Sequence, residues 1–304
     1  MVFTAIRKSL SLKVSITLAA ITLVLTTIAA VIIISRQAHS MEDLTMDKAK
    51  MSAQLGAKTY GRLLEDGIDN NHLTVQDVFD KNYIEIKGYN WNGTPRYHTR
   101  YDSYTDNVMV AFMDRFLASE DIIGAVGADI NGYVPTHNSK FMQMFTGDAA
   151  KDSSNNRSKR IFKDEVAVTA GKSEQPVLTQ AYHRDTGELT WDVSSPVYVK
   201  GKHWGCFRVI VSSAQIEKKR GELIWSLVAM FGAFSVITTA MIFSMLRRSI
   251  KPLVHLTHLA DEISLGEGLE NPIKTQSIDE VGMMTKAVDR LRASLKAAMA
   301  RLGE

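Results

Sequence analysis

Arginines and aromatic residues in the middle of this 304-residue chain have the chemistry of a small-molecule site. A guanidinium group forms paired, charge-assisted hydrogen bonds with a carboxylate, and aromatic rings can enclose the rest of a ligand. We predict a site for a small carboxylate or an amino acid, with Arg160 or Arg184 at the carboxylate. The predicted set is Tyr133, Arg157, Arg160, Tyr182, Arg184, Trp191, Trp204 and Arg208. A solvated basic loop beside core aromatic residues has the same composition, so the pattern alone favours neither arrangement.

Signals of catalysis are missing from the sequence. It contains no phosphate-binding loop, no nucleophile elbow and no His-Glu-x-x-His motif, so we expect no enzymatic activity, no catalytic residue and no cofactor. Three histidines of the central region, His137, His183 and His203, lack metal-ligand spacing, and we expect no metal site. Two others, His255 and His258, are better explained as members of a solvated helix face than as phosphoacceptors.

The net charge and the cysteine content exclude further classes of protein. The formal net charge is only +3, which gives a nucleic-acid partner no electrostatic support. Cys206 is the only cysteine, so the chain can form no internal disulfide and no paired-cysteine metal site. We expect Cys206 to be a small buried side chain. The soluble part must therefore be stabilised by an apolar core of its own.

Two uncharged apolar segments are long enough to cross a bilayer. They cover residues 14–35 and 223–246, and a hydrocarbon core of about 30 Å needs about 20 helical residues. The first segment is longer than the roughly 7–15 apolar residues of a signal peptide. We therefore interpret it as a retained membrane anchor.

Basic residues predict the orientation of the two segments, because Lys and Arg are retained on the cytoplasmic side. The flanking basic residues are Arg7, Lys8, Lys13, Arg247, Arg248 and Lys251. We expect a membrane protein in contact with lipid, with residues 1–13 and the C-terminus in the cytoplasm and residues 36–221 on the outer side of the membrane. The basic run at 218–220 opposes this topology. However, Lys and Arg determine orientation mainly in short loops, and the outer region is long.

The predicted outer region begins with helices. Apolar stripes and caps predict helices over 40–64, 73–79, 104–118 and 163–170, the first continuing the membrane segment and the second capped by Thr74. From residue 122 the pattern changes to strands. Small and β-branched residues predict a strand over 122–130, and Asn131-Gly132 predicts a hairpin to Tyr133 and Val134.

The end of the outer region predicts three antiparallel strands, over 177–183, 189–199 and 204–211, with turn sequences between them. Alternation in the last strand places Trp204, Cys206, Arg208 and Ile210 on one face. An arginine on a face with tryptophan and cysteine favours a pocket over a purely apolar core.

Apolar residues near the C-terminus recur at alternating steps of three and four, which is typical of the seam of a coiled coil. They are Leu253, Leu256, Ala260 and Ile263, then Val281, Met284, Val288, Leu291, Leu295 and Ala298. We expect a parallel homodimer in which the two stretches form a four-helix bundle.

Two short seamed helices after a membrane span resemble a HAMP domain, the signal-relay module of bacterial receptors. Pro252 stands in the expected first turn, two glycines at 266 and 268 end the first helix, and Asp279-Glu280-Val281-Gly282 opens the second. The resemblance covers residues 247–302 and implies relay residues, namely Pro252, Glu280, Val281, Met284, Val288 and Leu291. A juxtamembrane coiled coil without a signalling role is the alternative.

The outer region, residues 40–215, resembles a Cache-type sensor domain, in which an antiparallel sheet related to PAS domains holds a small ligand. Its similarity to methyl-accepting chemotaxis proteins lies in residues 128–138, 156–160, 182–187 and 203–205. The resemblance implies an α+β membrane protein with two transmembrane helices, a sensor domain with a long N-terminal helix, and a C-terminal HAMP coiled coil. Chemoreceptors and sensor kinases also carry an output domain, and we expect these 304 residues to hold the input and the relay without it. A stand-alone relay protein and a piece of a longer protein both fit this expectation.

The resemblances imply a bacterial inner-membrane protein with residues 36–221 in the periplasm. We therefore predict a chemoreceptor-like transmembrane sensor that acts on a cytoplasmic signalling partner. A small extracytoplasmic ligand would shift the helix that enters the second span, provided that it binds two states of the protein with different affinity. Two alternatives stay open at this stage. One is a membrane interaction protein whose periplasmic domain binds a protein partner, and the other is a truncated sensor kinase.

Overall fold

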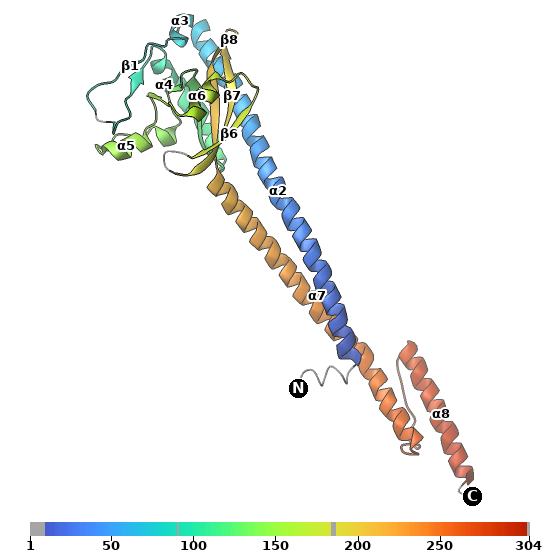
Figure 1. The fold of residues 1–304 in the computed structure, drawn as a ribbon. Coiled ribbons are helices and arrows are strands. Elements are labelled where there is room, and N and C mark those ends of the chain that lie inside the picture. The colour runs from blue at the N-terminus through green and yellow to red at the C-terminus, as the bar shows by residue number, and fades with distance from the viewer. Residues whose placement is uncertain (1–9, 90, 184–186, 303–304) are drawn as a thin grey trace. The chain divides into compact units, whose positions relative to one another are not determined.

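The computed structural model describes residues 10–89, 91–183 and 187–302, which fall into two compact units (Figure 1). Residues 35–224 are called the outer unit, and residues 1–34 with 225–304 are called the terminal unit. Among the described residues, α2 (Leu10–Asp69) and α7 (Ser213–Ser264) are long and apolar enough to cross a membrane. The predicted helix over 40–64 is confirmed, because α2 continues through it from the first apolar segment.

A four-stranded antiparallel sheet forms the centre of the outer unit. Its strands lie in the order β3 (Ile122–Asp129), β8 (Lys202–Ser212), β7 (Leu189–Val199) and β6 (Leu178–His183). The predicted three-strand meander is thus confirmed. Lys200 and Gly201 make the β7–β8 turn in the left-handed region, with φ of 48° and 76°. The predicted strand over 122–130 is also confirmed, and it pairs with the last strand of the meander.

The predicted hairpin at Asn131-Gly132 is wrong in its pairing. The turn itself forms, with Gly132 at φ 77° and its N–H donating to the Asp129 carbonyl at 3.0 Å. However, β4 (Tyr133–Val134) pairs with β5 (Arg160–Ile161) instead of folding back on β3. The Asp129 carboxylate accepts the N–H groups of Asn131 and Tyr133, at 2.8 and 2.9 Å. These bonds hold the turn, and the chain returns to the free edge of β3 three residues after β4, at an antiparallel bridge between Val126 and His137.

Short elements surround the sheet. They are α3 (Val75–Val78), β1 (Ile84–Glu85), β2 (Tyr97–His98), α4 (Asp102–Asp114), η1 (Arg115–Ala118), η2 (Ser139–Phe141), α5 (Ala149–Asn155) and α6 (Glu165–Lys172). The helices expected over 73–79, 104–118 and 163–170 are confirmed as α3, as α4 with η1, and as α6. Thr74 caps α3 as expected, because its hydroxyl accepts the Asp77 N–H at 3.1 Å. The other short elements were not predicted, because so few residues carry no readable periodicity.

The apolar core of the outer unit lies between the sheet and two helices, α2 and α4. Tyr60 of α2 packs against Phe207 of β8 with ring centroids 6.0 Å apart, and Phe112 of α4 packs against the same ring at 5.7 Å. Gly127 allows this approach, since a Cβ there would lie 2.3 Å from the Tyr60 ring. Because neighbouring strand residues point to opposite faces, Arg208 projects from the face that α2 leaves uncovered.

The alternation expected for the last strand is wrong at Trp204. Val197 pairs with Gly205 and Tyr198 pairs with His203, so Trp204 is an extra residue in a β-bulge. The bulge turns its ring toward the core, where it lies 5.3 Å from Tyr60 and its indole N–H donates to the Val78 carbonyl at 2.9 Å. Trp204 and Arg208 therefore lie on opposite faces of the sheet.

The terminal unit contains the end of α7 and α8 (Glu280–Leu302). Pro252 lies inside α7 rather than in the first turn of a new helix, so the helix start expected there is wrong. An interior proline removes one helical hydrogen bond but need not end the helix when neighbouring turns hold it. Gly266 and Gly268 end the segment as expected, with φ of 83° and 66°. Asp279 accepts the Gly282 N–H at 3.1 Å in the first turn of α8.

Candidate functional site

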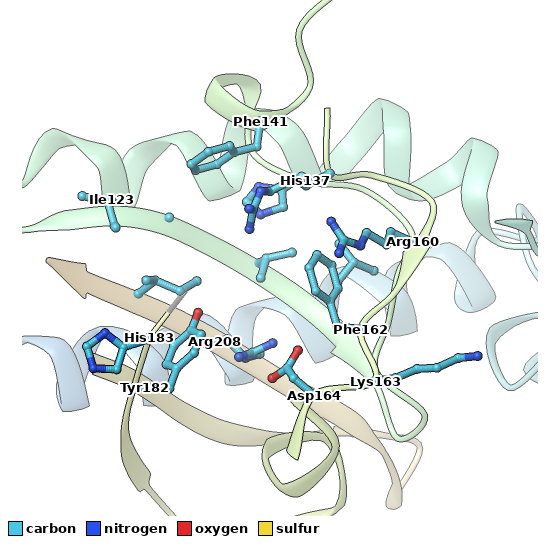
Figure 2. A pocket seen from close by; sticks show the side chains of 15 residues that line it. Ile123, His137, Phe141, Arg160, Phe162, Lys163, Asp164, Tyr182, His183 and Arg208 are labelled. Atoms are coloured by element: carbon cyan, nitrogen blue, oxygen red, sulfur yellow. The ribbon is translucent and has the colours of Figure 1, made fainter. Parts of the chain in front are cut away.

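A cavity of about 370 Å³ lies on the face of the sheet opposite α2 (Figure 2). Its floor is formed by β3 and β8, and its walls by β6, the segment after β4 and the segment from Arg157 to Asp164. The lining residues are Ile123, Gly124, Val126, Val134, His137, Phe141, Arg157, Arg160, Phe162, Lys163, Asp164, Tyr182, His183, Arg208 and Ile210. This mixture of apolar walls and a few convergent polar groups is typical of small-molecule sites.

A buried ion pair stands in the sheet beneath the cavity. The Nε of Arg208 donates to Oδ1 of Asp192 at 2.9 Å, and both side chains are almost fully buried. Burial raises the pKa of Asp192 above its usual value, against the opposing influence of Arg208. Burial acts to lower the pKa of Arg208, but the Asp192 carboxylate outweighs it and the pKa is raised. The pair therefore holds a charged guanidinium at the cavity floor.

Aromatic rings hold the other two cavity arginines. The guanidinium carbon of Arg157 lies 5.5 Å from the Phe141 ring centre, and that of Arg160 lies 4.6 Å from the Phe162 ring centre. Stacking of this kind orients a guanidinium group while leaving its edge for polar partners. Arg157 is buried, and its Nε also donates to the Ser154 carbonyl at 3.4 Å.

The charge that lines the cavity is mainly positive. Arg157, Arg160, Lys163 and Arg208 contribute four basic groups, and Asp164 contributes one carboxylate. Asp164 also caps α6, since its Oδ1 accepts the Ala167 N–H at 2.9 Å. Figure 2 shows its carboxylate directed toward the guanidinium of Arg208. The arrangement can accept an anion at the arginines and, at Asp164, a donor group of the same molecule.

The structure brings together four of the predicted ligand residues, namely Arg157, Arg160, Tyr182 and Arg208. Arg184 lies outside the described residues. Tyr133, Trp191 and Trp204 are not among the residues that line the cavity. The Tyr133 hydroxyl donates to Asp102 at 2.8 Å within the core, and Trp191 packs half-buried against the apolar core.

Several lining residues were not in the predicted set. His137 and His183 line the cavity, whereas His203 does not, and no group of three or more potential metal ligands occurs in the part of the chain that the structure describes. Phe141 and Phe162 enter through short elements without a sequence signal. Asp164 did carry a sequence signal, because it stands directly before a helical segment, in the position of a capping residue.

In the terminal unit, a connector between α7 and α8 is fastened to α8. The Asp289 carboxylate accepts the Ile273 N–H at 2.9 Å and the Arg292 Nε–H at 2.8 Å, and Arg292 also donates to the Leu269 carbonyl. Gly282 allows the connector to pass close to α8, since a Cβ there would lie 1.9 Å from the Ser277 carbonyl oxygen. The unit thus consists of two helices joined by an ordered return segment.

This helix, connector and helix arrangement coincides with a known family. The family model of the HAMP domain matches residues 245–297. These residues form a HAMP domain. The HAMP prediction from the seam and the Asp279-Glu280-Val281-Gly282 sequence is therefore confirmed. No curated protein gives a significant match to the chain.

Solved structures similar to the chain include the ligand-binding domain of the Campylobacter jejuni chemoreceptor Tlp3 in complex with 4-methylisoleucine. That match has 13% identity and a TM-score of 0.33, and it covers 64% of this chain and 61% of the other. The sensory domain of the same chemoreceptor with isoleucine bound matches with 14% identity and a TM-score of 0.29, over 62% of this chain and 65% of the other. The chain thus spans less than two thirds of these structures.

Proposed function

We propose that the protein is a transmembrane sensor of the bacterial inner membrane that binds a small ligand in the cavity and relays binding through its HAMP domain. One observation carries this proposal. Arg208 stands on the cavity floor in β8, and β8 ends at Ser212, directly before α7 begins at Ser213. A shift of β8 on ligand binding therefore acts on the helix that contains the second apolar segment and leads into the HAMP domain.

Contacts at the start of α7 support a tight connection to the sheet. The Nζ of Lys219 lies 2.9 Å from Oδ1 of Asp121, the residue before β3, and the hydrogen bond to Asp121 raises the pKa of Lys219. The Ser212 N–H donates to the Asp121 carbonyl at 3.1 Å. Asp121, directly before β3, is thus bound both to Lys219 of α7 and to Ser212 at the end of β8.

The ligand class follows from the charge of the cavity. Basic groups outnumber carboxylates among the lining residues, so an anion or a zwitterion with a carboxylate suits the site. Sensing requires that this ligand bind two states of the protein with different affinity. The HAMP domain then acts in a homodimer on a cytoplasmic signalling partner, and the proposal includes no catalytic step.

Ligand binding is tested with the full chain in lipid nanodiscs, by thermal unfolding in the presence of acetate, succinate, L-glutamate and L-valine. A ligand at 100 times its Kd stabilises the folded state by about 2.7 kcal/mol. We expect one of these carboxylates to raise the Tm. Arg160→Ala should then weaken its affinity roughly tenfold to a hundredfold, because a charge-assisted hydrogen bond is lost.

Arg62→Ala is the matched control, because Arg62 is an exposed arginine of α2 outside the cavity. It should leave the affinity unchanged. If Arg160→Ala and Arg62→Ala bind the carboxylate equally well, the cavity is not its site. If a protein from the periplasm binds the outer unit and every carboxylate leaves the Tm unchanged, a protein-binding role replaces the sensor proposal.

The proposed topology places both termini in the cytoplasm and the outer unit in the periplasm, with α2 and α7 crossing the membrane. It rests on two long apolar helices and on basic residues at the cytoplasmic ends of their apolar segments. Protease added to spheroplasts should digest the outer unit and spare tags at both termini. Protection of the outer unit would contradict this topology.

A further inference from the structure

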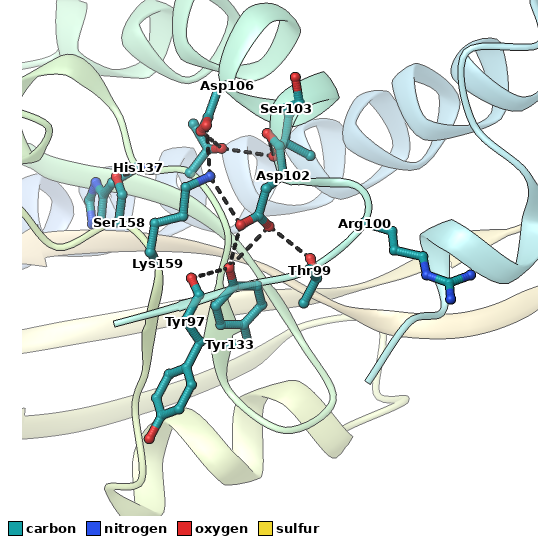
Figure 3. Close-up of polar contacts among 12 residues, drawn as sticks. Tyr97, Thr99, Arg100, Asp102, Ser103, Asp106, Tyr133, His137, Ser158 and Lys159 are labelled. Carbon is teal, nitrogen blue, oxygen red and sulfur yellow. Dashed lines mark hydrogen bonds and ion pairs between the residues drawn. The ribbon is translucent and has the colours of Figure 1, made fainter. Parts of the chain in front are cut away.

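The two cavity arginines of the segment after α5 stand on either side of Lys159, which points the other way. Arg157 and Arg160 line the cavity, whereas Lys159 is not among the lining residues. Figure 2 shows Arg160 at the cavity. In Figure 3 the Lys159 side chain extends toward the carboxylates of Asp102 and Asp106. In an extended chain, residues three apart point to opposite sides. Because both arginines line the same cavity, the backbone between them must depart from the extended conformation.

The break lies in the backbone of Lys159. Its φ is 62°, in the left-handed region that residues with a Cβ rarely adopt. Main-chain bonds hold the residue there, because its N–H donates to the Val134 carbonyl at 2.8 Å and its carbonyl accepts the Tyr97 N–H at 2.7 Å. This conformation reverses the direction of the chain locally, so that both arginines reach the same cavity.

The side chain of Lys159 anchors this conformation to α4. Its Nζ lies 2.7 Å from Oδ2 of Asp106 and 3.2 Å from Oδ2 of Asp102, and only 19% of the side chain is exposed. The two aspartates are four residues apart and therefore share one face of the helix. Figure 3 shows the lysine ammonium between them.

The same carboxylates also hold the neighbouring segment of the cavity lining, which pairs with the segment of the arginines through β4 and β5. Oδ1 of Asp106 accepts the Thr136 hydroxyl at 2.6 Å, and Thr136 directly precedes the cavity residue His137. Oδ2 of Asp102 accepts the Tyr133 hydroxyl at 2.8 Å. One pair of aspartates on α4 thus fixes two adjacent, hydrogen-bonded chain segments, both of which contribute residues to the cavity.

We propose that Lys159 is the positioning residue of the cavity: its ion pairs with Asp102 and Asp106 maintain the left-handed turn that directs Arg157 and Arg160 to one ligand. The proposal rests on the proposed function only in assigning a ligand to the cavity. The positions of the arginines are independent of any ligand.

The test measures arginine reactivity in the full chain in nanodiscs. Phenylglyoxal modifies accessible guanidinium groups, and mass spectrometry gives the rate at each arginine. Lys159→Ala removes the ion pairs and keeps a Cβ at φ 62°, whereas Lys159→Gly removes the ion pairs but relieves the backbone. Loss of a charge-assisted contact should increase the population of the state in which the two arginines are accessible to the reagent roughly tenfold.

We expect the modification rates of Arg157 and Arg160 to rise about tenfold in Lys159→Ala and by less in Lys159→Gly. Asp106→Asn, which keeps the size of the side chain, should raise the same two rates. Arg208, buried in the sheet, and Arg62, exposed on α2, should react as in the unmodified chain.

Unchanged rates at Arg157 and Arg160 in all three variants would overturn the proposal. An equal rise at Arg208 would also overturn it, because it would show a general loosening instead of a positioning role. Succinate and L-glutamate are titrated in parallel. If neither they nor acetate and L-valine bind the unmodified chain, the proposed function fails, while the reactivity of the arginines still decides the role of Lys159.

Discussion

Replacing Arg208 by methionine is expected to destabilise the outer unit by about 3–5 kcal/mol, because it leaves a buried carboxylate without its partner. Asp192 is fully buried, and its Oδ2 has no hydrogen-bond partner among the described residues, so Arg208 is its principal source of compensation. Thermal or denaturant unfolding of the full chain measures the loss. Lys163→Met is the matched control, since Lys163 also lines the cavity but is exposed, and it should change the stability little.

The loss should depend on pH. Burial already raises the pKa of Asp192 in the folded protein, and removing Arg208 removes the main influence that lowers it. An acid whose pKa is raised by folding is favoured in its protonated form, so the folded state takes up a proton that the unfolded state does not hold. Stability of the variant therefore falls as pH rises from about 4, the unfolded value, through the raised pKa.

Arg208→Met should consequently be destabilised more at pH 8 than at pH 5. A second substitution, Asp192→Leu, removes the buried charge and should recover much of the lost stability, because replacing both partners of a buried pair by apolar residues is often neutral. If the single variant is as stable as the unmodified chain at pH 8, the ion pair is not a determinant of the fold.

The elements that the sequence predicted are those with long, regular patterns. The meander of β6, β7 and β8 combines β-branched and aromatic residues in three strands, with turn residues between them. The HAMP helices show a repeat of three and four. In both cases many residues carry the same signal, so no single side chain decides the assignment.

Features decided by one tertiary contact could not be predicted. The bulge at Trp204 reverses the direction of one ring, which packs against Tyr60 and Tyr101 and donates a hydrogen bond to the Val78 carbonyl. The pairing of β4 with β5 depends on bonds from Asp129 that compete with a local hairpin signal. These two contacts explain why Trp204 and Tyr133 were placed in the ligand set although neither lines the cavity.

The arginines were predicted partly for the right reason. Charge and aromatic neighbours identified Arg157 and Arg160, and alternation along one strand identified Arg208. Alternation cannot explain how Arg157 and Arg160 reach one cavity, however, because that depends on the left-handed Lys159 and on two aspartates about 55 residues earlier in the chain. Long-range anchors of this kind leave no periodic signal.

Val288→Asp is expected to abolish dimerisation of the HAMP domain, whereas Lys286→Asp should leave most of it intact. In the single chain, Met284 and Leu291 are 52% and 67% exposed although they belong to the predicted seam, and Val288 lies between them along α8. A second copy that covers this stripe would bury the three side chains. A charge at Val288 would then be buried without a partner, at a cost of several kcal/mol, whereas Lys286 already lies exposed off the stripe.

The register of this seam is measured by disulfide crosslinking in membranes. Cys206 is fully buried, and burial raises the pKa of its thiol to about 12, so Cys206→Ala removes an unreactive background thiol. Single cysteines are then placed by Val288→Cys or Lys286→Cys. A disulfide needs Cα atoms within about 7 Å, which two seam positions of a parallel dimer satisfy and two outer positions do not. Crosslinking should be fast at position 288 and slow at position 286, and the reverse order would refute the assigned seam.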